Sequence, residues 1–330
     1  MYVNRHYSLW RTIRWSQTSL IKGLIYATAV VGLYKLTNWN LSLPWQPVSV
    51  VGIAVAFYLG FKNNSSYDRT WEARKIWGAI VNDSRTFSTA VISMVGGDDK
   101  ESQSIKTELI KRHIAWLISL RNALRVKRTW EHPAEKSIDR IVPGFSIRSI
   151  NSDQDELLKY LAKEEFDSYA DKTNWPAQIL KTQSLKIDAL YKSGKLSEYK
   201  QVWLHQLISK HYDNQGRSER IKNFPLPRQY ASTALWMTYF FCSLIPFGMI
   251  EIFEFAADAD VWFSIPISGL IIWLYFLMDK IGDYSENPFE GTYQDVPIST
   301  ITRAIEIDLL EMLDSETIPE PYPVENGFSM

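Results

Sequence analysis

The chain has 330 residues, a formal net charge of -1 and many aromatic residues, with 13 Trp, 15 Phe and 17 Tyr. A charge this close to zero argues against nucleic-acid binding. The single cysteine, Cys242, lies inside an apolar run, so a disulfide within the chain is excluded. The first residues lack a short apolar core with a small-residue cleavage site, and we therefore expect no secretory signal peptide.

The N-terminal part of the chain predicts a surface helix followed by a first membrane span. Residues 1–19 mix tryptophan and isoleucine with arginine, a composition suited to a helix at the lipid–water boundary. Residues 20–36 form an apolar run with Lys22 and Lys35 near its two ends, where long side chains can reach the interface. The uncharged stretch 38–47, with Pro44 and Pro47, predicts a short loop.

The following segment, residues 46–78, begins as an apolar helix and then continues into a polar and charged one. In its apolar half Ile53, Phe57 and Phe61 are spaced four apart and therefore share one face of the helix. Polar residues prolong this stripe: Asn64, Ser65 and Asp68. If copies of the helix surround an axis, the stripe lines a pore. Spacing alone favours ordinary packing residues, since apolar stripes on helices usually face a core.

The middle of the chain, residues 62–228, contains no apolar run of the roughly 20 residues that a membrane span needs. We predict a cytoplasmic helical domain that extends the second span. Periodic apolar residues and breakers indicate helices over 104–125, 153–169, 177–193 and 196–212. Residues 129–149, which contain two prolines, predict a loop.

A third span is predicted over residues 230–253 and a fourth over 261–278, with Pro246 and Pro266 inside them. The linker between these spans is acidic: Glu251, Glu254, Asp258 and Asp260. The flanks before the first span, after the second, before the third and after the fourth are basic, so the positive-inside rule places both termini and the middle region in the cytoplasm. A last helix is expected over 298–313, followed by a polar tail that is either disordered or extended along a neighbour. The chain therefore divides into an interfacial N-terminal helix (1–19), the first two transmembrane helices (20–61), a cytoplasmic helical domain (62–228), the last two transmembrane helices (229–280) and a cytoplasmic C-terminal segment (281–330).

The sequence shows no constellation that indicates an enzyme. The five histidines have no spacing typical of a zinc site, and neither a P-loop nor a dinucleotide-binding glycine motif occurs. We therefore predict no catalytic residues, no metal and no cofactor.

The segment FKNNSSYDRTWEARKIWG, residues 61–78, resembles the hallmark segment of the bestrophin family, in its bacterial and thylakoid-type branch. Three further segments resemble that family in the same order: 111–125, 213–230 and 286–298. The resemblance implies an all-helical membrane protein with four spans that assembles as a homopentameric ion channel. It assigns Ile53, Phe57 and Phe61 to a hydrophobic neck, and the polar stripe below them to a vestibule.

The resemblance also allows two further sites of the family to be compared with this sequence, a calcium site and a cytoplasmic constriction. In animal bestrophins an acidic run after an Asn-Pro-Phe motif binds calcium, but here that motif is followed by EGTYQD, which leaves Glu290 and Asp295. Calcium needs six or more oxygen ligands, so we expect no calcium site. The family also has an apolar constriction at the cytoplasmic mouth, and the position of Leu196 before the 213–230 segment makes it our candidate.

The predicted function is passive passage of small monovalent anions, chloride above all, across the cell (inner) membrane. The positive ring edges of Phe57 and Phe61 and the nearby Lys62 favour anions. Asp68 and the acidic linker oppose them, which keeps a monovalent cation channel of the same fold as an alternative. An alternative of another class is a membrane-anchored helical scaffold that binds a protein partner.

Overall fold

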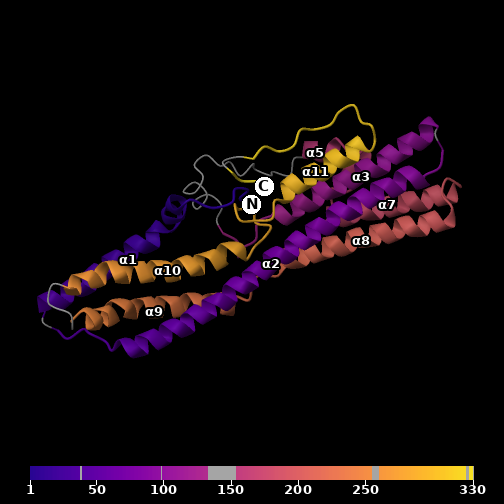
Figure 1. The fold of residues 1–330 in the computed structure, drawn as a ribbon. Coiled ribbons are helices and arrows are strands. Elements are labelled where there is room, and N and C mark those ends of the chain that lie inside the picture. The colour runs from indigo at the N-terminus through magenta and orange to yellow at the C-terminus, as the bar shows by residue number, and fades with distance from the viewer. Residues whose placement is uncertain (38, 98, 133–153, 255–259, 325–326, 330) are drawn as a thin grey trace.

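The computed structural model describes all residues except 38, 98, 133–153, 255–259, 325–326 and 330. Within these residues the regular structure is helical, apart from one isolated β-bridge. Figure 1 shows a long molecule in which α2, Trp45–Met94, runs diagonally from one half into the other. The sequence prediction of an uninterrupted helix that leaves the apolar region and continues is confirmed.

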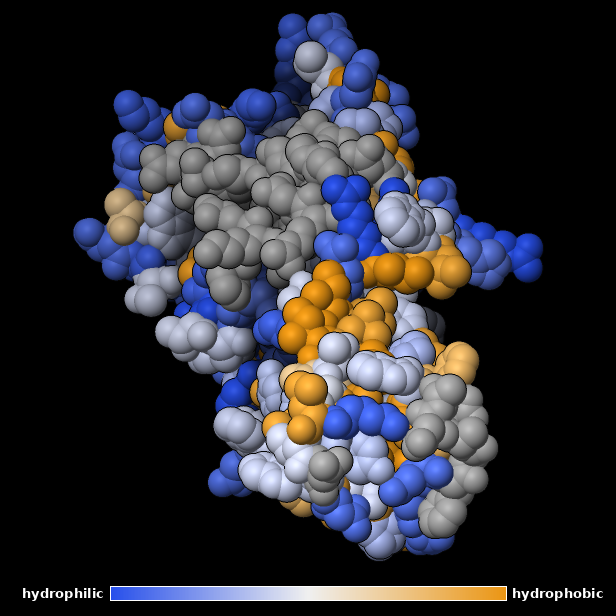
Figure 2. Space-filling view, turned by 90° about the vertical axis from the view of Figure 1, so that its left-hand side faces the viewer, coloured by the Kyte–Doolittle hydropathy of each residue, from blue (hydrophilic) through white to orange (hydrophobic). Residues whose placement is uncertain are grey.

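The first half of the molecule, on the left of Figure 1, contains α1, Leu9–Thr37, α9, Arg228–Glu254, and α10, Ser264–Ser285, beside the beginning of α2. By length and composition α1, α9 and residues 261–285 are each able to cross a membrane. The helix α2 is not among these three, because its apolar stretch ends at Phe61 and polar residues follow directly. In Figure 2, which looks onto this end, hydrophobic residues gather on the flank between the tip and the hydrophilic upper part.

The second half is a helical bundle built on the continuation of α2. It contains the following helices: α3, Lys100–Arg125; α5, Gln154–Leu158; α6, Lys163–Asp167; α7, Trp175–Lys192; α8, Glu198–Asn223; and α11, Ile298–Glu311. Side-chain caps fix two of the helix starts. Asp99 accepts a hydrogen bond from the backbone N–H of Ser102, and Asn174 accepts one from that of Ala177.

Each half has its own hydrophobic core, and α2 contributes to both. Val55 and Leu59 pack with α9 and α10 in the first core, whereas Ile76 and Trp77 pack with α3, α7 and α8 in the second. All four side chains are at most 2 % exposed. A change in the rotation of α2 would therefore disturb both cores at once.

Several boundaries differ from the prediction. The surface helix and the first span form one continuous helix, because no breaker separates residues 9 and 37. The helix predicted over 153–169 is two short helices, α5 and α6. The helix α8 continues to Asn223 through a polar sequence whose Asn214 and Ser218 are buried against the bundle. Pro266 lies in the first turn of α10, where its missing N–H costs no helical hydrogen bond.

The two ends of the chain meet near the middle of the molecule (Figure 1). Tyr2 forms an antiparallel bridge with Phe328, and the Val3 N–H donates to the Gly327 carbonyl at 2.8 Å. This end of the tail thus packs against its own N-terminal segment. The predicted loop 129–149 lies mostly outside the described residues, as does Asp258 of the acidic linker.

Candidate pore-lining site

The predicted neck residues form an exposed apolar stripe on α2. The exposed fractions of Ile53, Phe57 and Phe61 are 70 %, 68 % and 49 %. The rings of Phe57 and Phe61 meet edge to face, with centroids 4.6 Å apart. Within this subunit the stripe faces away from the first core, whose α2 members Val55 and Leu59 lie on the opposite side. The surface is therefore free to face a pore, a lipid or a second subunit.

The polar continuation of the stripe is also accessible. Asn64 and Asp68 are exposed and Ser65 is partly exposed. Two aromatic residues that the sequence analysis did not assign lie in the same turns, Tyr67 and Trp71. Their parallel rings have centroids 6.3 Å apart, and their exposed fractions are 61 % and 52 %. Their spacing of four residues was the available signal.

Lys62 does not have the role that the sequence suggested. Its ammonium lies 2.7 Å from the Asp279 carboxylate of α10, and its side chain is 2 % exposed. The charge that was expected to attract anions beside the neck is thus buried and neutralised inside the subunit. Successive residues of a helix point about 100° apart, so Phe61 can be exposed while its neighbour is buried.

Below this ion pair, hydrogen bonds hold α2 to the C-terminal end of α10 and to α8. The Arg69 guanidinium donates to the backbone carbonyls of Glu286, at 2.8 Å, and of Ile221, at 3.1 Å. The Thr70 hydroxyl donates to the Ser285 carbonyl at 2.8 Å. Arg69 therefore acts here as a structural donor, because these carbonyls engage its guanidinium.

Leu196 does not fit a constriction. Its side chain is 4 % exposed and belongs to the core of the second half. A residue that is buried within one subunit cannot line a channel between subunits. The turn at Gly194, whose φ is +75°, turns the chain so that Leu196 points inward. On the preceding helix α7, Leu185 is 59 % exposed and has the accessibility that such a residue requires.

The residues that replace the acidic run already have internal partners. Glu290 accepts a hydrogen bond from the backbone N–H of His132 at 2.6 Å, and the two side chains form an ion pair at 3.2 Å. Asp295 accepts hydrogen bonds from the backbone N–H and the hydroxyl of Thr292 and pairs with Arg125 at 3.2 Å. Among the described residues, no group of three or more histidine, cysteine or acidic side chains could hold a metal ion.

His132 bridges two carboxylates near the junction of the two halves. Its Nε2 lies 2.8 Å from Asp283, and its ring stacks on Tyr284 with centroids 4.4 Å apart. Burial alone lowers the pKa of His132, but hydrogen bonds to Asp283 and Glu290 outweigh burial and raise the pKa to about 10. A protonated His132 therefore holds this acidic pair together at neutral pH.

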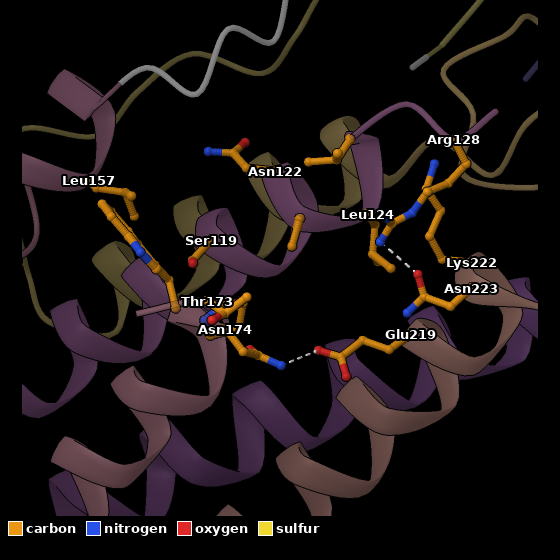
Figure 3. Close-up of a pocket in the computed structure, with 14 residues that line it drawn as sticks. Ser119, Asn122, Leu124, Arg128, Leu157, Thr173, Asn174, Glu219, Lys222 and Asn223 are labelled. Carbon is orange, nitrogen blue, oxygen red and sulfur yellow. Dashed lines mark hydrogen bonds between the residues drawn. The ribbon is translucent and has the colours of Figure 1, made fainter. Parts of the chain in front are cut away.

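A pocket of about 460 Å³ lies where α3, α7 and α8 end or begin (Figure 3). Two hydrogen bonds link its walls: Asn174 donates to Glu219 at 3.1 Å, and Arg128 donates to Asn223 at 2.7 Å. The pocket lies in the second half of the molecule, away from the exposed apolar stripe. We assign it no part in ion passage.

Comparison with known proteins finds a family model and several relatives that match most of this chain. Residues 13–311 match the family model described as "Bacterial/Fungal Bestrophin protein". A Salmonella typhi protein named "Voltage-dependent anion channel-forming protein YneE" is 28 % identical over 305 residues, which cover 91 % of this chain and 87 % of that protein. A Synechocystis protein, "Voltage-dependent anion channel-forming protein sll1024", is 23 % identical over 322 residues and covers 96 % of this chain and 94 % of its own.

The fold has solved counterparts. The crystal structure of a bacterial bestrophin homologue from Klebsiella pneumoniae superposes with a TM-score of 0.75 at 21 % identity, covering 91 % of this chain and 99 % of that one. The matched relatives are named as channel-forming proteins and not as enzymes. Because the family model spans most of the sequence, from α1 to the end of α11, this chain belongs to the bestrophin family, in its bacterial and fungal branch.

Proposed function

We propose that this chain is one subunit of a homopentameric channel that passes small monovalent anions, chloride above all, through a hydrophobic neck. The observation that carries the proposal is the exposed stripe of Ile53, Phe57 and Phe61, since three bulky apolar side chains are left uncovered within the subunit. Five copies around an axis would bury this stripe as three stacked rings. An ion in such a passage loses water, which makes the neck the main barrier to conduction.

In this proposal α2 supplies a fourth span with its apolar half, although three other helices are the more apolar ones. Both termini and the second half of the molecule lie in the cytoplasm, and the membrane is the inner membrane. Asn64, Ser65 and Asp68 face the wet vestibule below the neck, where polar groups replace part of the hydration shell of an ion.

Anion passage is supported by the names of the relatives and by the ring edges at the neck. Lys62 no longer supports it, because its charge is paired with Asp279. The exposed Asp68 remains the feature that favours the alternative, a monovalent cation channel of the same fold.

The test is ion flux through the purified full-length protein in liposomes. Chloride efflux that requires the protein supports the channel. A protein that inserts and assembles but passes no ion supports the alternative of another class, a membrane-anchored scaffold for a protein partner.

A further inference from the structure

A pocket of about 270 Å³ lies between α1, α9 and α10, apart from the neck stripe. Its polar wall comes from α1 and α9, and its apolar wall comes mainly from α10. The lining residues used below are Thr18, Ser19, Lys22, Tyr239, Ile272 and Phe276. Lys22 and Tyr239 are both exposed, so the pocket opens to the surroundings of these helices.

Lys22 brings an unpaired positive charge to this pocket. Among the residues that the structure describes, no carboxylate lies within ion-pair distance of its ammonium, whereas Lys62 on α2 is paired. Lys22 is the third residue of the apolar run 20–36, about 21 Å along the helix from Leu36 at 1.5 Å per residue, and so lies near the cytoplasmic end of this run in the proposed orientation. At this end of the run the Lys22 ammonium can reach the level of the lipid headgroups, where an anionic group can accompany it.

Residues with hydroxyl groups line the same pocket as Lys22. Thr18 and Ser19 lie four and three residues before Lys22, which places each of them beside Lys22 on the surface of α1. Tyr239 of α9 adds a phenol that is 52 % exposed. The Lys22 ammonium and the hydroxyls of Ser19 and Tyr239 are donors suited to the oxygens of a phosphate group.

The apolar wall continues from this polar cluster. Ile272 and Phe276 line the pocket from α10, and Gly23 lets α1 approach closely, since a Cβ there would lie 3.0 Å from Ile272. On the adjoining surface Ile25 of α1 and Phe240 of α9 are 65 % and 60 % exposed. A polar cluster beside an apolar groove matches a molecule with an anionic head and an apolar tail.

We propose that this pocket binds an anionic phospholipid of the cytoplasmic leaflet, with its phosphate at Lys22 and an acyl chain along Ile272 and Phe276. The positive charge of Lys22 favours an anionic lipid over a neutral one. Basic pockets between spans on the cytoplasmic side are suited to anionic headgroups. The inference rests on the proposed membrane orientation of α1 and not on ion passage. Loss of lipid binding and loss of flux are therefore separate results.

The experiment measures thermal unfolding of the purified full-length protein in detergent. Phosphatidylglycerol is compared with phosphatidylcholine of the same acyl chains, and inorganic phosphate is tested alone. We expect phosphatidylglycerol to raise Tm more than phosphatidylcholine, with no rise from phosphate. In Lys22→Gln the apparent affinity for phosphatidylglycerol should fall about fivefold, as expected for one lysine at a membrane surface.

Two variants act as controls. Lys22→Arg keeps the charge and should retain the lipid-dependent rise in Tm. Lys35→Gln removes the lysine at the other end of the apolar run 20–36, and this variant should also retain the lipid-dependent rise in Tm. An equal rise in the unaltered protein and in Lys22→Gln, or an equal rise with phosphatidylcholine, overturns the proposal. Stabilisation by phosphate alone would identify a site for free anions and would also overturn the lipid proposal. A cysteine placed at position 22 that crosslinks to a neighbouring copy would overturn it as well, because the pocket would then face another subunit.

Discussion

Lys62 of α2 and Asp279 of α10 form an ion pair of 2.7 Å, with side chains that are 2 % and 11 % exposed. This pair adjoins the end of the neck stripe and joins residues that are far apart in the sequence. It fixes the face that α2 presents, because rotating the helix would separate the two charges or expose them to apolar surroundings.

The first prediction is that Asp279→Asn strongly destabilises the protein. The change leaves the Lys62 ammonium buried without a charged partner, which typically costs about 3–5 kcal/mol. Thermal unfolding in detergent should show a large fall in Tm. Glu72→Gln is the matched control, since the Glu72–Lys75 pair of 2.6 Å is largely exposed and such pairs contribute about 0–1 kcal/mol. Equal effects of the two changes would show that burial of the Lys62 pair does not matter.

The second prediction concerns the neck. Replacing Ile53, Phe57 and Phe61 together by alanine should raise ion flux several-fold or more while the assembly persists, because truncation lowers the dewetting barrier. Single-channel current measures the effect. Leu274→Ala on α10 removes an exposed apolar side chain of similar size and should leave the current unchanged. An unchanged current in the triple variant would make the three residues packing residues.

The sequence predicted the neck stripe and the continuous helix α2 well, because both depend on local features. A spacing of four residues places side chains on one face, and no proline interrupts the helix between its first turn and Met94. The exposed aromatic pair Tyr67 and Trp71 carried the same local signal. The stripe is accessible in the structure, whereas its role as a neck stays a prediction.

The environment of Lys62 and Leu196 could not be predicted locally. Lys62 is neutralised by Asp279, a partner on another span that no periodicity within α2 indicates. Leu196 follows a glycine turn, and whether it points inward depends on the turn conformation and on how α8 packs. Both errors arose because charge and burial are set by contacts between helices that are distant in the sequence.

The third prediction is an alkaline loss of stability caused by His132. Its pKa is raised to about 10 in the folded protein, above the ordinary value of 6.5. The folded state therefore binds the proton of His132 more tightly than the unfolded state does. The resulting stabilisation is full below pH 6.5 and is lost as the pH rises through about 10. Tm should therefore fall between neutral pH and pH 10, and the fall should be shallower in His132→Gln. His205→Gln, which changes a histidine of α8, should keep the original slope.

The fourth prediction is that micromolar calcium neither opens the channel nor raises Tm. The carboxylates of Glu290 and Asp295 already pair with His132 and Arg125, respectively. Calcium would raise Tm only if it bound the folded protein, and these paired carboxylates are not free to bind it. Unfolding curves with calcium and with a chelator should coincide. A calcium-dependent rise in Tm that disappears in Asp295→Asn would reveal a calcium site.

The last prediction concerns ion selectivity. Charges at an open mouth are screened over about 8 Å at physiological ionic strength, whereas groups at the narrowest part act where water is scarce. The neck should therefore outweigh the exposed Asp68, and the edge-to-face rings of Phe57 and Phe61 present positive edges to an anion. Under a potassium chloride gradient the reversal potential should lie near the chloride equilibrium potential. A value near the potassium equilibrium potential would establish the cation alternative, and Asp68→Asn should then shift it toward zero.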